Sequence, residues 1–206
     1  MKKITLLAAL FCILIGYAQE EKKEKSKFDF EFTYKIGSSN LRNSEVGVLN
    51  GNIQGFSLQS SYMLFEDSIL DDIRLQFGLQ FMEFNSGLVL NNLNATLSNN
   101  YIQAPLGLIF STSKNRPYRF NIGGGVIANY FLRSELFELA GSSKDNINRI
   151  TFGYFGVVGF DFYINEKFFV GFNVGSQGDY SSIRTNGVSN RLVRARYAQI
   201  SLGFDF

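Results

Sequence analysis

The chain of 206 residues contains no histidine, one cysteine and two prolines. Without histidine, the side chain that most often acts as a general base at neutral pH is missing, and no serine or aspartate stands in a recognisable nucleophile motif. The cysteine, Cys12, lies in an N-terminal segment that we expect to be removed. The remaining chain would have no disulfide and no Cys or His metal ligand. We therefore predict a protein that is not an enzyme and has no cofactor.

The sequence also lacks an apolar run long enough to cross a bilayer as a helix. The N-terminal apolar run, residues 4–15, follows Lys2 and Lys3 and precedes Gly16-Tyr17-Ala18, a small-x-small cleavage pattern. This arrangement predicts a secretory signal peptide over residues 1–18, with an anchoring or buried N-terminal helix as the alternative. Residues 19–27, QEEKKEKSK, are a mixed-charge run that predicts a solvated tether.

The chain has almost no net charge, with 20 Lys and Arg against 18 Asp and Glu. Cleavage after Ala18 would remove two lysines and no acid, which leaves the mature chain formally neutral. A protein that binds nucleic acid through charge needs a basic excess, so no nucleic-acid partner is predicted. Aromatic residues are abundant, with 22 Phe and 10 Tyr. Because both types favour strands, the composition predicts β structure, in one domain over residues 28–206.

Eight segments alternate between apolar and polar residues with a period of two, the pattern of strands with two different faces. In 28–37, Phe28, Phe30, Phe32, Tyr34 and Ile36 alternate with Asp29, Glu31, Thr33 and Lys35. The other segments are 53–65, 73–84, 101–110, 118–132, 150–164, 168–176 and 193–206. Pro105 cannot donate to a sheet ladder, so we expect a bulge or a local break there. Gly123-Gly124-Gly125 is not followed by the GK[ST] of a phosphate loop and is interpreted as strand glycines.

The connections between these segments alternate in length. Residues 38–52, 85–100, 133–149 and 177–192 are long and polar, whereas 66–72, 111–117 and 165–167 are short. Antiparallel hairpins place alternate connections at opposite ends of a sheet, so all the long ones lie at one end. An even strand number, long external loops and short periplasmic turns are typical of outer-membrane barrels. The sequence thus predicts an all-β fold, an eight-stranded antiparallel transmembrane β-barrel with short periplasmic turns and four long extracellular loops.

The two strand faces distinguish a membrane barrel from a soluble one. A lipocalin-like barrel turns its apolar face inward and its charges outward. In this chain the apolar face is almost free of charge, and the other face carries small residues, amides and a few charges, as a narrow lumen does. Together with the secretory signal, this pattern favours an apolar face that contacts lipid in the outer membrane. A soluble periplasmic barrel that binds an apolar ligand is the less favoured alternative.

Six charged residues fall on the polar face, namely Asp29, Glu31, Lys35, Arg74, Arg119 and Asp161. An eight-stranded barrel is only wide enough to be filled by side chains, so we predict that these charges neutralise one another in a lumen network. The alternative is an ion path or a ligand site. Asp29 and Glu31 would suit acid–base chemistry in principle, yet they also suit a lumen lining. Two basic groups are candidates for contact with lipid head groups: Arg191, Arg194 and Arg196, and Lys114, Arg116 and Arg119. Arg194 and Arg196 begin the last strand at its loop end and are also candidates for contact with a saccharide or a phosphate.

Four stretches carry a family likeness: Asn100-Tyr101-Ile102-Gln103-Ala104-Pro105-Leu106, with a Tyr-x-x-x-Pro-Leu pattern; the glycine-rich 117–130; 152–164 with its Asn-Glu-Lys turn; and 199–206. Through them the chain resembles the outer-membrane β-barrel domain family common in Bacteroidetes, which includes PorT-like proteins. The resemblance implies an outer-membrane location and a barrel fold, and it implies no shared activity.

The last strand resembles an outer-membrane assembly signal, with Leu202, Phe204 and Phe206 as its apolar positions and Ser201 where such signals often carry glycine. We expect it to pair with the first strand, because closure leaves no exposed edge in lipid. The expected partners are outer-membrane lipid, the barrel assembly machinery and an unidentified surface partner at the loops. The predicted function is that of a non-enzymatic, structural or surface-binding outer-membrane protein, with a small pore or an accessory factor for secretion or transport as the alternative.

Overall fold

The computed structural model of the chain describes residues 27–44, 47–68, 71–90, 93–112, 117–138, 141–145, 150–185 and 188–206. The predicted signal peptide, residues 1–18, lies outside the described residues, and so does the predicted tether except for Lys27. Within the described ranges, no helix is long and apolar enough to cross a membrane.

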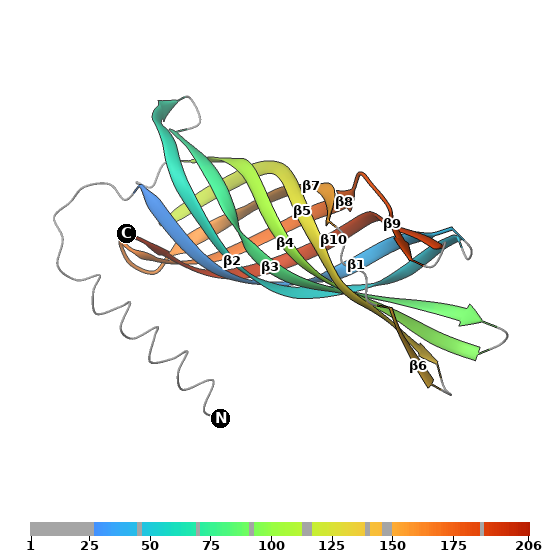
Figure 1. Ribbon diagram of the computed structural model, residues 1–206. Coiled ribbons are helices and arrows are strands. Elements are labelled where there is room, and N and C mark those ends of the chain that lie inside the picture. Colours follow the sequence, from blue (N-terminus) through green and yellow to red (C-terminus); the bar gives the residue numbers. More distant parts are fainter. Residues whose placement is uncertain are drawn as a thin grey trace.

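Within the described residues, ten strands form one antiparallel sheet (Figure 1). Eight of them make the wall of a barrel: β1 (Phe28–Asn43), β2 (Gly47–Ser68), β3 (Asp71–Leu90), β4 (Leu93–Ser111), β5 (Tyr118–Glu138), β7 (Ile150–Tyr163), β8 (Phe168–Asp179) and β10 (Val188–Asp205). The short strands β6 (Gly141–Asp145) and β9 (Ile183–Thr185) pair with β5 and β10. The sheet closes because β10 pairs with β1 as well as with β8, starting from Asp29 opposite Asp205. The predicted eight-stranded antiparallel barrel and its seam are confirmed.

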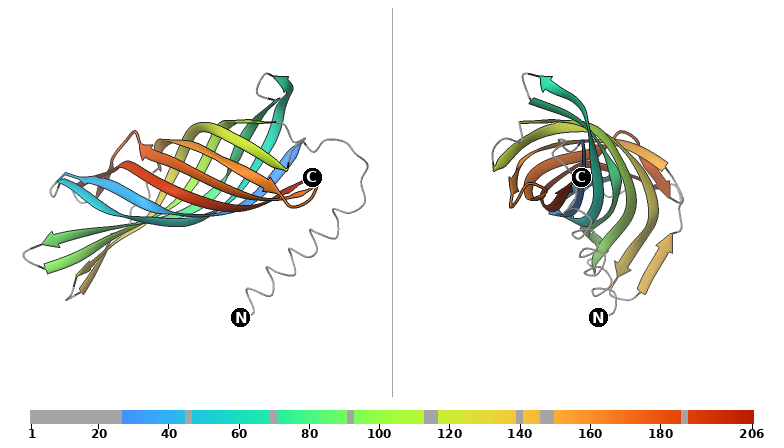
Figure 2. Two further views of the ribbon diagram at one scale, coloured as in Figure 1. Left: turned by 180° about the vertical axis from the view of Figure 1, so that it is seen from behind. Right: turned by 90° about the vertical axis from the view of Figure 1, so that its left-hand side faces the viewer.

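The two ends of the barrel differ. The C-terminus and the start of β1 lie together at one end, called here the C-terminal rim (Figures 1 and 2). The predicted tight turn between β7 and β8 is at this rim, where the side-chain oxygen of Asn165 accepts hydrogen bonds from the backbone N–H groups of Lys167 (2.9 Å) and Phe168 (2.7 Å). The hairpins β1–β2, β3–β4 and β5–β6 lie at the opposite end, called the hairpin rim.

The segments predicted as long loops are largely strands. β1 continues to Asn43 and β2 begins at Gly47, while β3 and β4 extend to Leu90 and Leu93. The prediction of irregular loops over 38–52 and 85–100 was therefore wrong, because these residues are mostly in strands. The two segments are still long connections, since each forms a hairpin that extends beyond the wall. Asn, Ser and Gly are not strong strand formers, but hydrogen-bonded pairing between neighbouring strands extends the sheet beyond the barrel wall. Gly47 has a φ of 91°, a left-handed conformation that glycine adopts without strain.

The sheet is locally interrupted opposite Pro105, as expected. Between β3 and β4, Phe77 pairs with Leu106 and Gln80 with Gln103, while the two positions between them are not paired and the register is unchanged. Proline has no N–H to donate at this point of the ladder. Gly123-Gly124-Gly125 lie inside β5, as the strand interpretation predicted.

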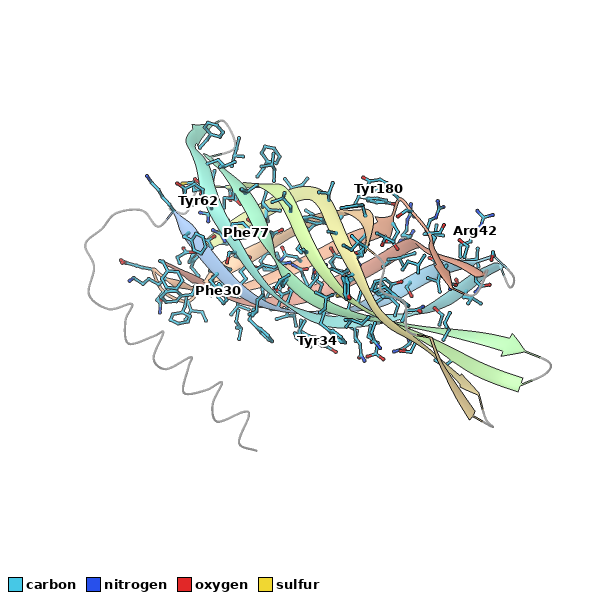
Figure 3. The ribbon with its side chains drawn as sticks, in the orientation of Figure 1. Phe30, Tyr34, Arg42, Tyr62, Phe77 and Tyr180 are labelled. Carbon is cyan, nitrogen blue, oxygen red and sulfur yellow. The ribbon has the colours of Figure 1, made fainter. Side chains whose placement is uncertain are left out.

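The apolar face of the wall points outward. Along β1, Phe32, Tyr34 and Ile36 are 39%, 46% and 56% exposed, whereas Thr33 and Lys35 are 0% and 3% exposed. Figure 3 shows the labelled side chains of Phe30, Tyr34, Tyr62 and Phe77 on the outside of the barrel. The predicted outward apolar face is confirmed, and the polar face of the wall strands points into the interior.

Candidate functional site

The lumen near the C-terminal rim contains a layer of buried ion pairs, called here the charged layer. Asp29 of β1 accepts hydrogen bonds through one oxygen, Oδ2, from Nη1 of Arg74 on β3 and from Nη1 of Arg119 on β5 (2.9 Å for Arg119). Arg119 also donates from Nε (2.9 Å) and Nη2 (2.8 Å) to Oδ2 of Asp161 on β7. None of the four side chains is more than 2% exposed. Since β1 and β5 lie on opposite sides of the barrel, the Asp29–Arg119 pair spans the lumen.

Neighbouring side chains complete this layer. Asp72 lies 3.4 Å from Nη2 of Arg74, and the guanidinium of Arg119 lies 5.0 Å and 5.5 Å from the rings of Phe169 and Tyr163. Sequence reasoning missed Asp72 because it was assigned to the connection 66–72. The sequence nevertheless indicated its position, because Asp72 and Arg74 are two residues apart and therefore lie on the same face of β3.

Two of the six predicted lumen charges do not join these ion pairs. Glu31 lines a cavity beside Arg74 and Arg119, but within the described residues it forms no ion pair. Lys35 lies deeper in the lumen, where Nζ donates to Oε1 of Gln80 (2.5 Å) and lies 5.0 Å from the centre of the Tyr197 ring. A single network of all six charges is therefore not formed, because Lys35 lies about 20 Å along β1 from Asp29.

Side-chain amides connect Lys35 to a second buried charge. Gln80 donates to Gln103 (2.7 Å), Gln103 to Asn129 (2.7 Å), and Asn129 to Oδ1 of Asp179 (2.8 Å). An ammonium only donates and a carboxylate only accepts, so the two ends fix the direction of every amide between them. This amide layer links β1, β3, β4, β5 and β8 in mid-lumen, and nothing in the alternation pattern identified its cross-lumen partners.

An apolar layer fills the lumen toward the hairpin rim. Its members are Ile53, Met82, Phe84, Tyr101, Phe131, Ile183, Leu192, Ala195 and Tyr197. The ring of Tyr101 packs edge-to-face on Phe84 (5.2 Å) and Phe131 (5.1 Å) between ring centres. The sequence predicted small residues, amides and a few charges inside. The sequence contained an indication that was overlooked: several apolar residues stand at alternate positions that belong to the polar face of their strands.

Little space remains between these layers. Two adjoining lumen cavities have volumes of about 10 and 20 Å³, room for on the order of one water molecule each. Large inward rings lie against glycines: a Cβ at Gly175 would lie 2.6 Å from the Tyr197 ring, and one at Gly203 would overlap the Phe169 ring. Among the described residues, no group of three or more His, Cys, Asp or Glu side chains is arranged to hold a metal ion.

Four of the six residues predicted to contact lipid head groups are described in the structure. Arg194 and Arg196 are exposed on β10 and Arg191 is half-buried, whereas Arg119 is inside the lumen, so its predicted contact with lipid head groups was wrong. Lys114 and Arg116 lie outside the described residues.

The predicted assembly signal is only partly accessible. Leu202 and Phe206 are 48% and 55% exposed, but Phe204 is 8% exposed. The ring of Phe204 packs against those of Phe168 (4.9 Å) and Phe206 (4.7 Å). In the folded barrel, Phe204 is therefore covered by its neighbours.

Comparison with known proteins identifies the fold. No protein-family model matches the sequence, and the search of curated proteins finds no match. Neisserial surface protein A is 12% identical with a TM-score of 0.52, over 89% of this chain and 100% of that chain. The outer-membrane protease OmpT of Escherichia coli is 8% identical with a TM-score of 0.53 (90% and 99%), and the outer-membrane protein OprG of Pseudomonas aeruginosa is 16% identical with a TM-score of 0.52 (89% and 97%). At these identities the likeness shows the fold, which is that of outer-membrane β-barrels.

Proposed function

We propose that the chain is an outer-membrane protein whose wall contacts lipid. The observation that carries this proposal is a belt of exposed apolar side chains to which every wall strand contributes. Its members include Phe32, Leu58, Leu79, Leu106, Ile122, Val158, Phe172 and Ile200, from 39% to 61% exposed. A continuous apolar surface on all sides would be unfavourable in water, and soluble proteins rarely expose patches of more than a few hundred Å². Lipid acyl chains remove that cost.

The filled lumen supports a structural or binding role over that of a pore. An ion crossing the barrel would have to pass the apolar layer and then separate the Asp29–Arg119 pair. A small pore or an accessory factor for secretion or transport remains the second candidate, favoured only by the two small cavities.

The hairpins at the hairpin rim support binding at the cell surface. β3–β4 and β5–β6 project beyond the rest of the barrel in both views (Figures 1 and 2). In our proposal this rim faces outward from the cell and binds an as yet unidentified partner. We propose no enzymatic activity, because Asp29 and Asp161 are held by arginines and the sequence has no histidine.

The family resemblance, the signal peptide and the assembly signal belong to the same proposal. The resemblance to the Bacteroidetes outer-membrane barrel family with PorT-like members is supported by the sequence stretches that suggested it. The signal peptide over 1–18 and recognition of Leu202, Phe204 and Phe206 by the barrel assembly machinery are supported by the sequence pattern. Leu202 and Phe206 are also exposed on the folded wall.

Surface crosslinking on intact cells tests the binding role. In the test variant, residues 87–96 are replaced by Asn-Gly, a two-residue turn that fits between the paired residues Ser86 and Leu97. The wild-type chain is expected to crosslink to a surface partner that the variant loses. Both proteins should keep heat-modifiable gel migration, which reports an intact barrel.

A matched variant shortens the neighbouring β1–β2 hairpin. In it, Asn-Gly replaces residues 41–49 between the paired residues Asn40 and Asn50. Crosslinks that survive both shortenings, or that never form, would contradict surface binding through these hairpins. Wild-type protein that is soluble and monomeric without detergent would contradict the membrane proposal itself.

A further inference from the structure

Four arginines lie on the outer face of the seam between β1 and β10, near the hairpin rim: Arg42, Arg191, Arg194 and Arg196. Arg42 is directly opposite Arg191, while Arg194 and Arg196 are opposite Asn40 and Ser38. Leu41 and Leu192, next to Arg42 and Arg191, are 1% and 2% exposed and point into the lumen, which places the arginines outside. Figure 3 shows Arg42 at the end of the barrel remote from Phe30.

These guanidinium groups are close together. Of the described acidic side chains, that of Asp179 is near enough to Arg191 to interact with it electrostatically. Residues directly opposite in an antiparallel pair have Cβ atoms about 5 Å apart, and alternate residues on a strand are about 7 Å apart. Within the described part of the chain, none of the four arginines forms an ion pair. Their cross-strand neighbours on this face are Val48, Asn50 and Asn52 of β2 and Ser176 of β8, none of which is acidic. Like charges directly opposite each other are destabilising, so the cluster favours a bound anion.

The position of the cluster indicates where that anion comes from. The next outward pair along the seam toward the C-terminal rim is Ile36 with Ala198, followed by Tyr34 with Ile200. Ile36, Tyr34 and Ile200 are 56%, 46% and 53% exposed. The arginines thus lie at the edge of the apolar belt, at the height where head groups meet acyl chains. Asn40 donates to Asn50 (2.5 Å) beside them, so amides that suit sugar hydroxyls border the same patch.

We propose that Arg42, Arg191, Arg194 and Arg196 form a binding site for the phosphate groups of a phosphorylated glycolipid in the leaflet at the hairpin rim. The guanidinium fork matches phosphate oxygens in bidentate geometry, and the acyl chains of the same lipid lie along Ile36, Tyr34 and Ile200. A free phosphate would use the arginines alone and leave the apolar edge without a role. The site rests on the proposed function, because it requires the wall to be in lipid.

Native mass spectrometry of the full chain folded in zwitterionic detergent tests the site. The probes are diphosphoryl lipid A, the same lipid without its phosphates, and inorganic phosphate. The test variant is R42Q/R194Q/R196Q, and the control is K22Q/K23Q/K25Q, which removes the same charge from lysines that precede β1. We expect the wild type and the control to retain the phosphorylated lipid about tenfold more strongly than the dephosphorylated one, and the test variant to lose that preference.

Equal retention of the two lipids by the wild type, or an unchanged preference in the arginine variant, would overturn the site. Displacement of the lipid by inorganic phosphate at equal concentration would show a simple anion site and would overturn the lipid assignment. Heat-modifiable migration is measured on the same samples. If the wild type is not a folded barrel in detergent, the proposed function fails; if it folds and shows no preference, only the glycolipid site fails.

Discussion

Asp29 is the residue on which the charged layer depends. Its Oδ2 atom accepts from two arginines on different strands, and Ser61 also donates to it at 3.3 Å. Removing one partner of a buried ion pair leaves an uncompensated buried charge, whereas the pair itself contributes little net stability. The layer therefore fixes which strands face one another across the lumen more than it adds to the free energy of unfolding.

The substitution Asp29→Asn tests this role. It breaks the ion pairs of Asp29 with Arg74 and Arg119, while Asp72 stays near Arg74 and Asp161 stays paired with Arg119, so we expect the free energy of unfolding in lipid to fall by about 1 to 3 kcal/mol. The measurement is urea unfolding of barrel reconstituted in vesicles. Glu31→Gln is the matched control, because it removes the same charge two residues away, where no ion pair is broken, and it should cost much less. Equal losses in the two variants would show that net lumen charge, and not pairing, matters.

Gly203 provides a second test at the scale of single residues. A Cβ at this position would overlap the ring of Phe169, which lies against the guanidinium of Arg119. Gly203→Ala should therefore destabilise the barrel by about 1 to 3 kcal/mol, the usual cost of overpacking. Gly156→Ala is the control, since the nearest atom to its added Cβ is 3.8 Å away. A stable Gly203→Ala variant in urea unfolding would mean that the lumen is less tightly filled than described.

The contrast between Asp29 and Lys35 shows what the sequence alone can predict about the site. Alternation placed both residues, and all six lumen charges, on the correct face of their strands. It did not predict which charges meet, because cross-lumen contacts depend on strand register and on closure of the barrel. Lys35 reaches Asp179 only through three amides on other strands, a relation that no local pattern encodes.

At the scale of strands, β10 closes the barrel by pairing with β1 and also contributes exposed side chains to the outer wall. Leu202 pairs with Phe32 of β1 and Val170 of β8, and it lies within the apolar outward positions of the last strand, which follow its outward arginines. Its 48% exposure means that lipid, and not another strand, is its main neighbour in our account. A charge at this position would have to be solvated in the bilayer core.

Leu202→Arg is therefore expected to cost about 2 to 4 kcal/mol of stability in lipid. The measurement is equilibrium folding into vesicles, and the control is Ile164→Arg, in the β7–β8 turn at the C-terminal rim. Near an interface the same charge should cost about 1 kcal/mol or less. If Leu202→Arg folds as well as Ile164→Arg, the apolar face of β10 does not contact the hydrocarbon core.

The eight wall strands were predictable because each alternates strictly where one face is apolar. Their ends were not. Beyond the apolar belt the outward face of a strand is polar, while the inward face holds buried apolar residues such as Leu41 and Leu49. The alternation seen in the wall is lost, and residues such as Asn50 and Asn94 indicate a loop, although both lie within strands. The register that continues from the wall determines the structure there, and this information is not local in the sequence.

At the scale of the whole molecule, three layers divide the lumen: ion pairs near the C-terminal rim, amides in the middle and apolar side chains toward the hairpin rim. The two lumen cavities between the described residues have volumes of about 10 and 20 Å³, each room for on the order of one water molecule. Purified barrel in a planar bilayer should therefore show no steady open current. A stable conductance, from protein whose folding is verified by heat-modifiable migration, would favour the pore alternative.

The most direct test of the central claim, a lipid-facing wall around a closed lumen, is fluorescence quenching by brominated lipids. The chain contains no tryptophan, so a single introduced tryptophan is the only one in the protein and its fluorescence reports on one position. On β7, Phe160 is 42% exposed on the outer wall and Phe155 is 9% exposed in the lumen. We predict strong quenching of Phe160→Trp and weak quenching of Phe155→Trp in folded, reconstituted protein. Equal quenching at the two positions, or the reverse order, would contradict the account.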